Sequence, residues 1–121
     1  MAIKTYSLKV DGNRNLIDNF KVKEFSCPGS DAILIDDALV VALQKVRDHF
    51  AQPVTITSGY RAEAWNKKIG GSPSSQHLLG KAADIVAQGV TPLAVARYAE
   101  SMGMGGVGHY TAGQGNEYGF Q

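Results

Sequence analysis

The residues of this sequence best suited to chemistry are a histidine and an aspartate seven positions apart, His77 and Asp84. An imidazole nitrogen and a carboxylate oxygen are both good zinc ligands. A catalytic zinc site needs three protein ligands and one open position for water, so this pair would supply two of them. Spacing alone does not establish a site, because a metal also needs convergent geometry. The pair therefore predicts a zinc site that requires a third ligand from elsewhere in the chain.

The residues around this pair favour a tight functional turn. Gly80 permits a backbone conformation closed to other residues, and the small side chains of Ala82 and Ala83 allow close packing. The apolar run 85–87 predicts a buried strand that begins near Asp84. A carboxylate at the start of a buried strand needs a partner, because an unpaired buried charge is costly.

Arg61 is a second candidate. It follows the β-branched run 53–58, which predicts a strand, and Gly59 then opens a turn that presents the next side chains. A guanidinium is a permanently charged fork of donors, suited to binding a carbonyl or carboxylate oxygen. The alternative interpretation of Arg61 is a surface salt bridge.

Two motifs in this sequence carry a resemblance to a known family. The pattern Ser-x-His-x-x-Gly-x-Ala-x-Asp over 75–84, preceded by Ser-Gly-Tyr-Arg over 58–61, resembles the signature of the zinc D-alanyl-D-alanine carboxypeptidase-like peptidases, which are related to lysostaphin-type enzymes and to the hedgehog signalling domain. The likeness extends through 66–71 to the Gly-Gly-Val-Gly-x-Tyr stretch at 105–110, and so covers most of the chain from about Phe25 onward.

The resemblance implies a fold, a cofactor and roles for residues. The implied fold is α+β, a small antiparallel sheet with helices packed on it, as in hedgehog and D-Ala-D-Ala peptidases. The resemblance assigns zinc binding to His77 and Asp84, and binding of the substrate carbonyl or carboxylate and of the oxyanion to Arg61. Short members of the family are often phage or prophage cell-wall peptidases.

The third zinc ligand is the open question of the sequence. The family takes it from a C-terminal pattern of aromatic, any residue, His, apolar, Asp, and Phe120 and Gln121 would be the first two positions of that pattern. A shortened chain, an inactive relative and a substitute ligand are the three explanations, of which we favour the first. His109 is the first candidate substitute, although strand alternation could equally point it to solvent. His49 lies near a helix end, where a structural role is favoured.

Glu117 is the candidate general base. In the family, a carboxylate shortly before the last ligand takes the proton of the attacking water and passes it to the leaving amine. Glu117 is the carboxylate in that region, although its offset is uncommon and a solvated loop residue is the alternative interpretation. The sequence has no His-Glu-x-x-His helix, so it does not predict a thermolysin-type site.

Two function classes follow from these residues. The first is a zinc-dependent peptidase that hydrolyses peptide bonds in the stem peptides of bacterial peptidoglycan, next to a D-amino acid. The second is an inactive relative that binds peptidoglycan or a protein partner without turnover. The sequence leaves open exopeptidase against endopeptidase action and D,D against L,D linkages.

Composition limits the partners. The chain has 121 residues and a net charge of +1, which gives no general attraction to nucleic acid. No stretch approaches the length of a membrane span. Cys27 is the single cysteine, so it has no internal disulfide partner. The segment from Met1 to Val10 lacks the pattern of a secretory signal, and we expect synthesis in a bacterial cytoplasm and action on the wall after phage-type release or delivery.

The expected elements form a single peptidase-like domain over 1–121. We expect residues 1–25 to be an extended N-terminal arm, with a strand at 3–10, a turn at Asp11-Gly12 and a second extended piece at 20–25. Helices are expected from Asp36 or Asp37 to Phe50, at 62–69 and from Thr91 to Met102, with strands at 53–58, near 84–87, at 107–110 and from about Tyr118. An unfinished sheet edge near the C-terminus predicts a monomer or a strand-exchanged oligomer.

Overall fold

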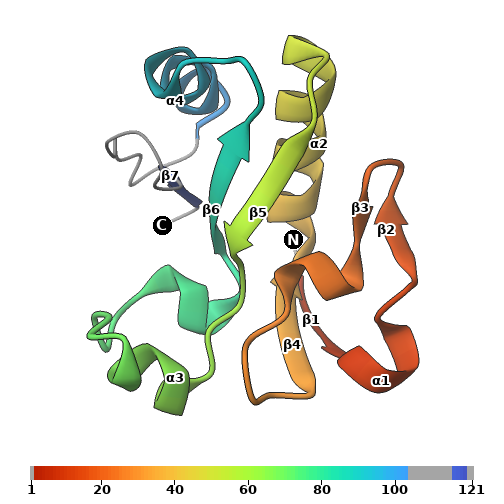
Figure 1. The fold of residues 1–121 in the computed structure, drawn as a ribbon, viewed down its shortest axis with the longest axis vertical. Helices are drawn as coiled ribbons and strands as arrows, with labels where there is room; N and C mark the ends of the chain where they lie inside the picture. The colour runs from red at the N-terminus through yellow and green to blue at the C-terminus, as the bar shows by residue number, and fades with distance from the viewer. Residues whose placement is uncertain (1, 104–115, 120–121) are drawn as a thin grey trace.

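The computed structural model describes residues 2–103 and the backbone of the strand at 116–119, and the fold is α+β (Figure 1). In chain order the elements are β1 (Ile3–Ser7), α1 (Leu8–Asp11), β2 (Asn15–Ile17), β3 (Phe20–Lys21), the 3-10 helix η1 (Val22–Phe25), β4 (Ala32–Asp36), α2 (Asp37–Phe50), β5 (Val54–Ser58), α3 (Glu63–Lys68), the 3-10 helix η2 (Gln76–Leu79), β6 (Ala82–Ala87), α4 (Pro92–Ser101) and β7 (Asn116–Gly119).

The sheet that carries the candidate site is antiparallel, with strand order β5-β6-β7. Side chains alternate between its faces, and those of Ala83, Ile85 and Ala87 are buried in the hydrophobic core. Asp84 and Val86 therefore lie on the other face, where Val86 is exposed. The register is irregular between Ile56 and Ser58 in β5, and Ser58 then lies opposite Asp84.

Helices α2 and α4 contact each other and β6, and so close the core side of the sheet (Figure 1). The expected start of α2 is confirmed, because the Asp36 carboxylate accepts a hydrogen bond from the backbone N–H of Ala38 at 2.8 Å. The expected start of α4 is also confirmed, with the Thr91 hydroxyl accepting from Ala94 N and Pro92 in the first turn. On α2, Leu39, Leu43 and Val46 are buried, and Phe50 is partly buried against the core.

The expected extended structure near the N-terminus is wrong in two places. Residues 8–11 form α1 because the Ser7 hydroxyl caps a helical turn by accepting from Val10 N, and Asp31 accepts from Lys9 N at 2.9 Å. Residues 22–25 form η1 because the Glu24 carboxylate accepts from Lys21 N at 2.6 Å and closes the turn. In both places a local hydrogen bond from the backbone to a side chain stabilises a helical turn over an extended conformation.

The strand β4 was not predicted. Its residues Ile33 and Ile35 are fully buried, and β4 pairs with β1 in an antiparallel two-stranded sheet. The turn between β2 and β3 is attached to α2 through Gln44, whose side chain accepts from Asn19 N at 3.0 Å and donates to Asn19 Oδ1 at 2.7 Å. The N-terminal third of the chain is thereby packed onto the same core as the sheet.

Three further expectations have definite outcomes. The helix expected at 62–69 is confirmed as α3, and its Trp65 is half-buried and lies outside the hydrophobic core. The strand expected near Tyr118 is confirmed as β7, which pairs with β6. The strand expected at 107–110 and the loop after it lie outside the described residues, apart from Asn116. Among the described residues, no helix is long and apolar enough to cross a membrane.

Candidate metal centre

His77 is placed by the short helix η2, which lies where β5 ends and β6 begins, at the opposite end of the sheet from α4 (Figure 1). The Ser75 hydroxyl caps η2 by accepting from His77 N at 3.2 Å. Gly80 ends it in the left-handed region with a φ of 71°. A side chain at Gly80 would collide with the backbone of Leu34 in β4, so glycine is required there for two separate reasons.

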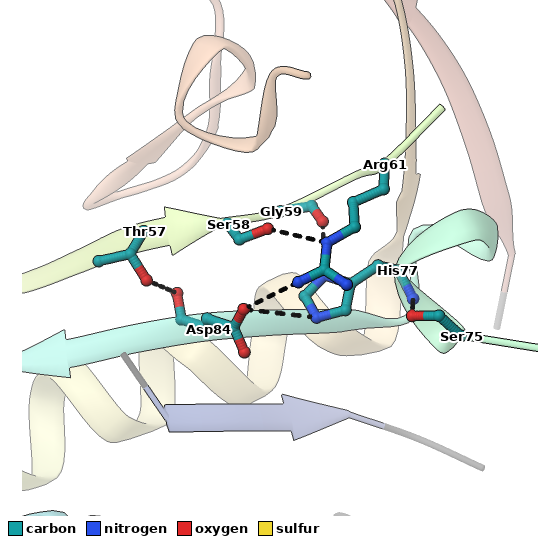
Figure 2. A network of polar contacts seen from close by, with 7 residues as sticks. All are labelled: Thr57, Ser58, Gly59, Arg61, Ser75, His77 and Asp84. Carbon is teal, nitrogen blue, oxygen red and sulfur yellow. Dashed lines mark hydrogen bonds and ion pairs between the residues drawn. The ribbon is translucent and has the colours of Figure 1, made fainter. Parts of the chain in front are cut away.

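The imidazole of His77 is fully buried, and its orientation is set by the turn after β5 (Figure 2). Its Nδ1 lies 2.7 Å from the carbonyl oxygen of Gly59, which can only accept a hydrogen bond, so Nδ1 carries the proton and donates. The neutral imidazole then has its lone pair on Nε2, which lies 3.7 Å from Oδ2 of Asp84. Metal-binding histidines are held by this kind of second hydrogen bond, which fixes the ring orientation and the tautomer.

Asp84 presents one paired and one unpaired oxygen. Its Oδ2 lies 3.3 Å from an Nη atom of Arg61 and faces His77, as Figure 2 shows. Its Oδ1 is buried and has no hydrogen-bond partner. A buried unpaired carboxylate oxygen costs free energy, and a bound cation is one of the few ligands that relieves that cost.

The donor set fits zinc. Two atoms that bind one tetrahedral zinc at about 2.1 Å lie about 3.4 Å apart. The 3.7 Å between His77 Nε2 and Asp84 Oδ2 is close to that separation and is longer than a good hydrogen bond. The tautomer of His77, the unpaired Asp84 Oδ1 and this distance together fit the requirements for two ligands of one metal ion.

Arg61 lies beside the pair, with a side chain that is 15% exposed. Its Nε donates to the Ser58 hydroxyl at 3.3 Å, and its backbone N–H donates to the His77 carbonyl at 3.1 Å. The turn that carries Arg61 is packed tightly, because a side chain at Gly59 would come within 2.7 Å of the Phe25 Cα atom. In place of the surface salt bridge weighed above, the structure gives Arg61 a largely buried ion pair with Asp84.

The pKa of His77 is the result of opposing effects. Burial is the largest and lowers the pKa, because desolvation disfavours the charged imidazolium. The Asp84 carboxylate and the Gly59 carbonyl stabilise the charged form, and the Arg61 charge opposes it. The net effect is a pKa above the ordinary value of 6.5, so a proton competes with a metal for Nε2 near neutral pH.

The other candidate residues have different outcomes. His49 is exposed and stacks on Tyr98 with 3.9 Å between ring centroids, so the structural role expected for it is confirmed. Glu117 in β7 lies directly opposite Asp84 in the backbone register, which is the position across the ladder nearest to that carboxylate. His109 lies outside the described residues. Within the part of the chain that is described, no group of three or more His, Cys, Asp or Glu residues could hold a metal.

Sequence reasoning missed part of the support around the two ligands. The carbonyl of Gly59 orients His77, although the sequence indicated only a turn there. Ser58 holds Arg61, and Ser75 caps the helix that carries His77. Both serines stand in the two motifs, so the motifs signalled them without indicating what they bind.

A buried imidazole, a carboxylate and an arginine at one end of an antiparallel sheet form a group of side chains suited to a divalent metal ion and a hydrolytic reaction. The chain belongs to the Peptidase M15 family, whose model matches residues 18–114. This match confirms the resemblance to the D-Ala-D-Ala carboxypeptidase-like peptidases, and members of the family are generally zinc-dependent.

The chain was also compared with curated proteins and with solved structures. None of the curated proteins matches the chain. A similar solved structure is the crystal structure of Serratia marcescens L-Ala D-Glu endopeptidase ChiX, with a TM-score of 0.49 and 23% sequence identity. The match covers 72% of this chain and 80% of the ChiX chain.

Proposed function

We propose that this protein is a zinc-dependent metallopeptidase that hydrolyses peptide bonds in the stem peptides of bacterial peptidoglycan, next to a D-amino acid. The observation that carries the proposal is the pair of His77 Nε2 and Asp84 Oδ2, 3.7 Å apart, with His77 Nδ1 hydrogen-bonded to Gly59. Membership of the Peptidase M15 family supports the peptidase activity. The D-amino acid specificity follows from the motif resemblance over 58–61 and 75–84.

His77 and Asp84 are the residues that would hold the zinc ion. When bound, zinc lowers the pKa of a water molecule and polarises the scissile carbonyl group. The Gly59 carbonyl keeps the His77 lone pair directed at the metal position. The unpaired Oδ1 gives Asp84 a second oxygen with which to bind.

Arg61 would stabilise the negative charge that develops on the scissile carbonyl oxygen. Its Nε is occupied by Ser58 and one Nη by Asp84, which fixes the plane of the guanidinium and leaves further N–H donors for a substrate oxygen. Glu117 is the proposed general base, and its register position opposite Asp84 supports this assignment.

A second candidate function is a module that binds wall peptide or a protein without turnover. The finding that favours it is the lack of a third metal-binding group beside His77 and Asp84 in the described residues. His109 remains the proposed substitute ligand. The protein is proposed to be a monomer or a strand-exchanged oligomer.

Action on the cell wall after synthesis in a bacterial cytoplasm and phage-type release or delivery is part of the same proposal. The net charge of +1 gives no reason to expect nucleic acid as a partner.

The test of the proposed function is a digest of purified peptidoglycan, with the released fragments identified by mass spectrometry. The wild-type protein is expected to release stem-peptide fragments or D-alanine, and His77→Ala is expected to release none. His49→Ala is the matched control, because it removes an exposed imidazole on α2 and is expected to leave activity unchanged. Stable binding to the wall by a wild-type protein that cuts no bond would support the binding module instead.

A further inference from the structure

A groove lies beside the metal-ligand pair, between α3 and the loop that leads to η2. It has a volume of about 750 Å³, within the range of about 300–1,000 Å³ typical of ligand sites. Arg61 and Leu78, which is next to His77 in the sequence, both line it. Asn66, Lys67, Gly71 and Pro73 also line it. The groove therefore adjoins the place where a scissile bond would lie.

The most unusual residue of this groove is Asn66 on α3, which is 97% buried, with 3% of its surface exposed. Its side-chain Nδ2 donates to the Ser72 carbonyl at 2.8 Å, and its backbone carbonyl accepts from Gly71 N at 2.8 Å. Because a carbonyl can only accept, the bond to Ser72 fixes which end of the amide is Nδ2. The other end, Oδ1, is buried and has no hydrogen-bond partner.

An unpaired buried acceptor of this kind is unfavourable, because no hydrogen bond offsets the loss of its hydration. In the described residues, the buried side-chain oxygens without a partner are Asp84 Oδ1 and Asn66 Oδ1. The first is accounted for by the metal that the family and the donor set imply. The second belongs to a groove residue, and a ligand that donates a hydrogen bond would account for it in the same way.

We propose that this groove is a peptide-binding subsite in which Asn66 Oδ1 accepts a hydrogen bond from a backbone N–H of the substrate. The inference rests on the proposed function, because it takes the ligand to be the peptide that the site would cleave. A peptide backbone carries an acceptor beside each donor, and the cationic donors of Arg61 and Lys67 line the same groove. Pro73 and Leu78 supply apolar surface for the substrate's Cα and side-chain atoms.

The turn at Gly70-Gly71 controls access to Oδ1. A side chain at Gly71 would collide with Asn66 Oδ1, so the turn lies directly over this oxygen and shields it from water. Both residues of the turn are glycines, whose backbones adopt a wider range of conformations than those of other residues, so the turn can rearrange. Binding of the substrate then involves an outward movement of this turn that breaks the hydrogen bond from Gly71 N to the Asn66 carbonyl, after which the substrate N–H takes the place of the Gly71 backbone over Oδ1.

The test is an affinity comparison on the full chain by calorimetry, with a chelator present so that hydrolysis does not occur. The probes are a synthetic peptidoglycan stem peptide and analogues in which one backbone N–H at a time is replaced by an ester oxygen. One analogue is expected to bind the wild-type protein about tenfold more weakly than the parent peptide, since it lacks the donor for Oδ1. Asn66→Ala is expected to bind the parent and that analogue equally.

One control variant completes the design. Lys68→Ala, on the same helix but outside the groove, is expected to behave as wild type. Equal binding of all the analogues to the wild-type chain would overturn the inference, and this result does not depend on any variant folding. A folded Asn66→Ala that still preferred the parent peptide over the same analogue would also overturn it.

The outcome is separable from that of the proposed function. Cleavage of peptidoglycan with no N–H preference would overturn this inference alone. An N–H preference that depends on Asn66, without cleavage by the metal-loaded wild type, would retain the subsite and overturn the peptidase.

Discussion

The requirement for glycine at position 80 gives a quantitative test of how the site is supported. Gly80 has a φ of 71°, and Gly89 has a φ of 72°, so a side chain at either position meets the same backbone strain. They differ in their surroundings. A Cβ atom at Gly80 would collide with Leu34 O and lie 2.8 Å from Ile35 N, whereas nothing lies within 4 Å of one at Gly89. Gly89→Ala is therefore the matched control for Gly80→Ala.

The expected magnitudes follow from these two terms. A left-handed conformation costs a residue with a side chain about 1–2 kcal/mol, which is the whole expected effect of Gly89→Ala. Gly80→Ala adds the cost of overpacking, typically about 1–3 kcal/mol, because backbone atoms of β4 must move to admit the methyl group. The movement also threatens the hydrogen bond from Asp36 N to Gly80 O, which is 2.9 Å long. The total expected loss is about 2–5 kcal/mol.

The assay is equilibrium unfolding in urea of the wild type and both variants, monitored by circular dichroism. The difference in the free energy of unfolding between the two variants isolates the contact of η2 with β4. If Gly80→Ala were no less stable than Gly89→Ala, the close approach of Gly80 to Leu34 would not exist in the protein, and the placement of His77 derived from it would be wrong.

Three further predictions concern the ligands and their supports. Gly59→Ala is expected to weaken zinc affinity about 10–100-fold in a competition titration with a chelator, because it displaces the carbonyl that orients His77, and unchanged affinity would contradict that role. Zinc affinity is expected to fall as the pH drops through the raised pKa of His77, with the loss beginning above 6.5. The reason is that the Asp84 carboxylate stabilises the protonated imidazole, which cannot bind a metal. Zinc titrations at pH values on both sides of 6.5 test this, and an affinity that does not change with pH would contradict it. Gln44→Ala is expected to lower the free energy of unfolding by about 0.5–1.5 kcal/mol, since it removes the hydrogen bonds that tie the exposed turn residue Asn19 to α2, and an unchanged free energy of unfolding in urea would refute the bridge.

The elements that sequence reasoning predicted correctly are those defined by local signals. The caps Asp36 and Thr91 begin α2 and α4, and β-branched residues mark β5. These signals depend on hydrogen bonds and packing within one or two turns of the chain. The motif over 75–84 predicted that His77 and Asp84 act together, and the structure places them 3.7 Å apart.

The features that were missed depend on contacts between distant parts of the chain. The strand β4 exists because it pairs with β1, and its apolar run of three residues gave no indication of that partner. The Gly59 carbonyl meets His77 across 18 positions of sequence. The unpaired oxygen of Asn66 can be recognised only once the loop over it is placed. Hydrogen bonds of this kind leave no periodic pattern in a sequence.

The metal content of the purified chain, measured by elemental analysis beside His77→Ala and the control His49→Ala, tests the central claim most directly. The account predicts about one zinc per chain in the wild type and in His49→Ala, and almost none in His77→Ala. Zinc retained at the wild-type level in a folded His77→Ala, or a wild-type chain that binds no zinc when it is supplied in excess, would contradict the assignment of His77 and Asp84 as a metal centre.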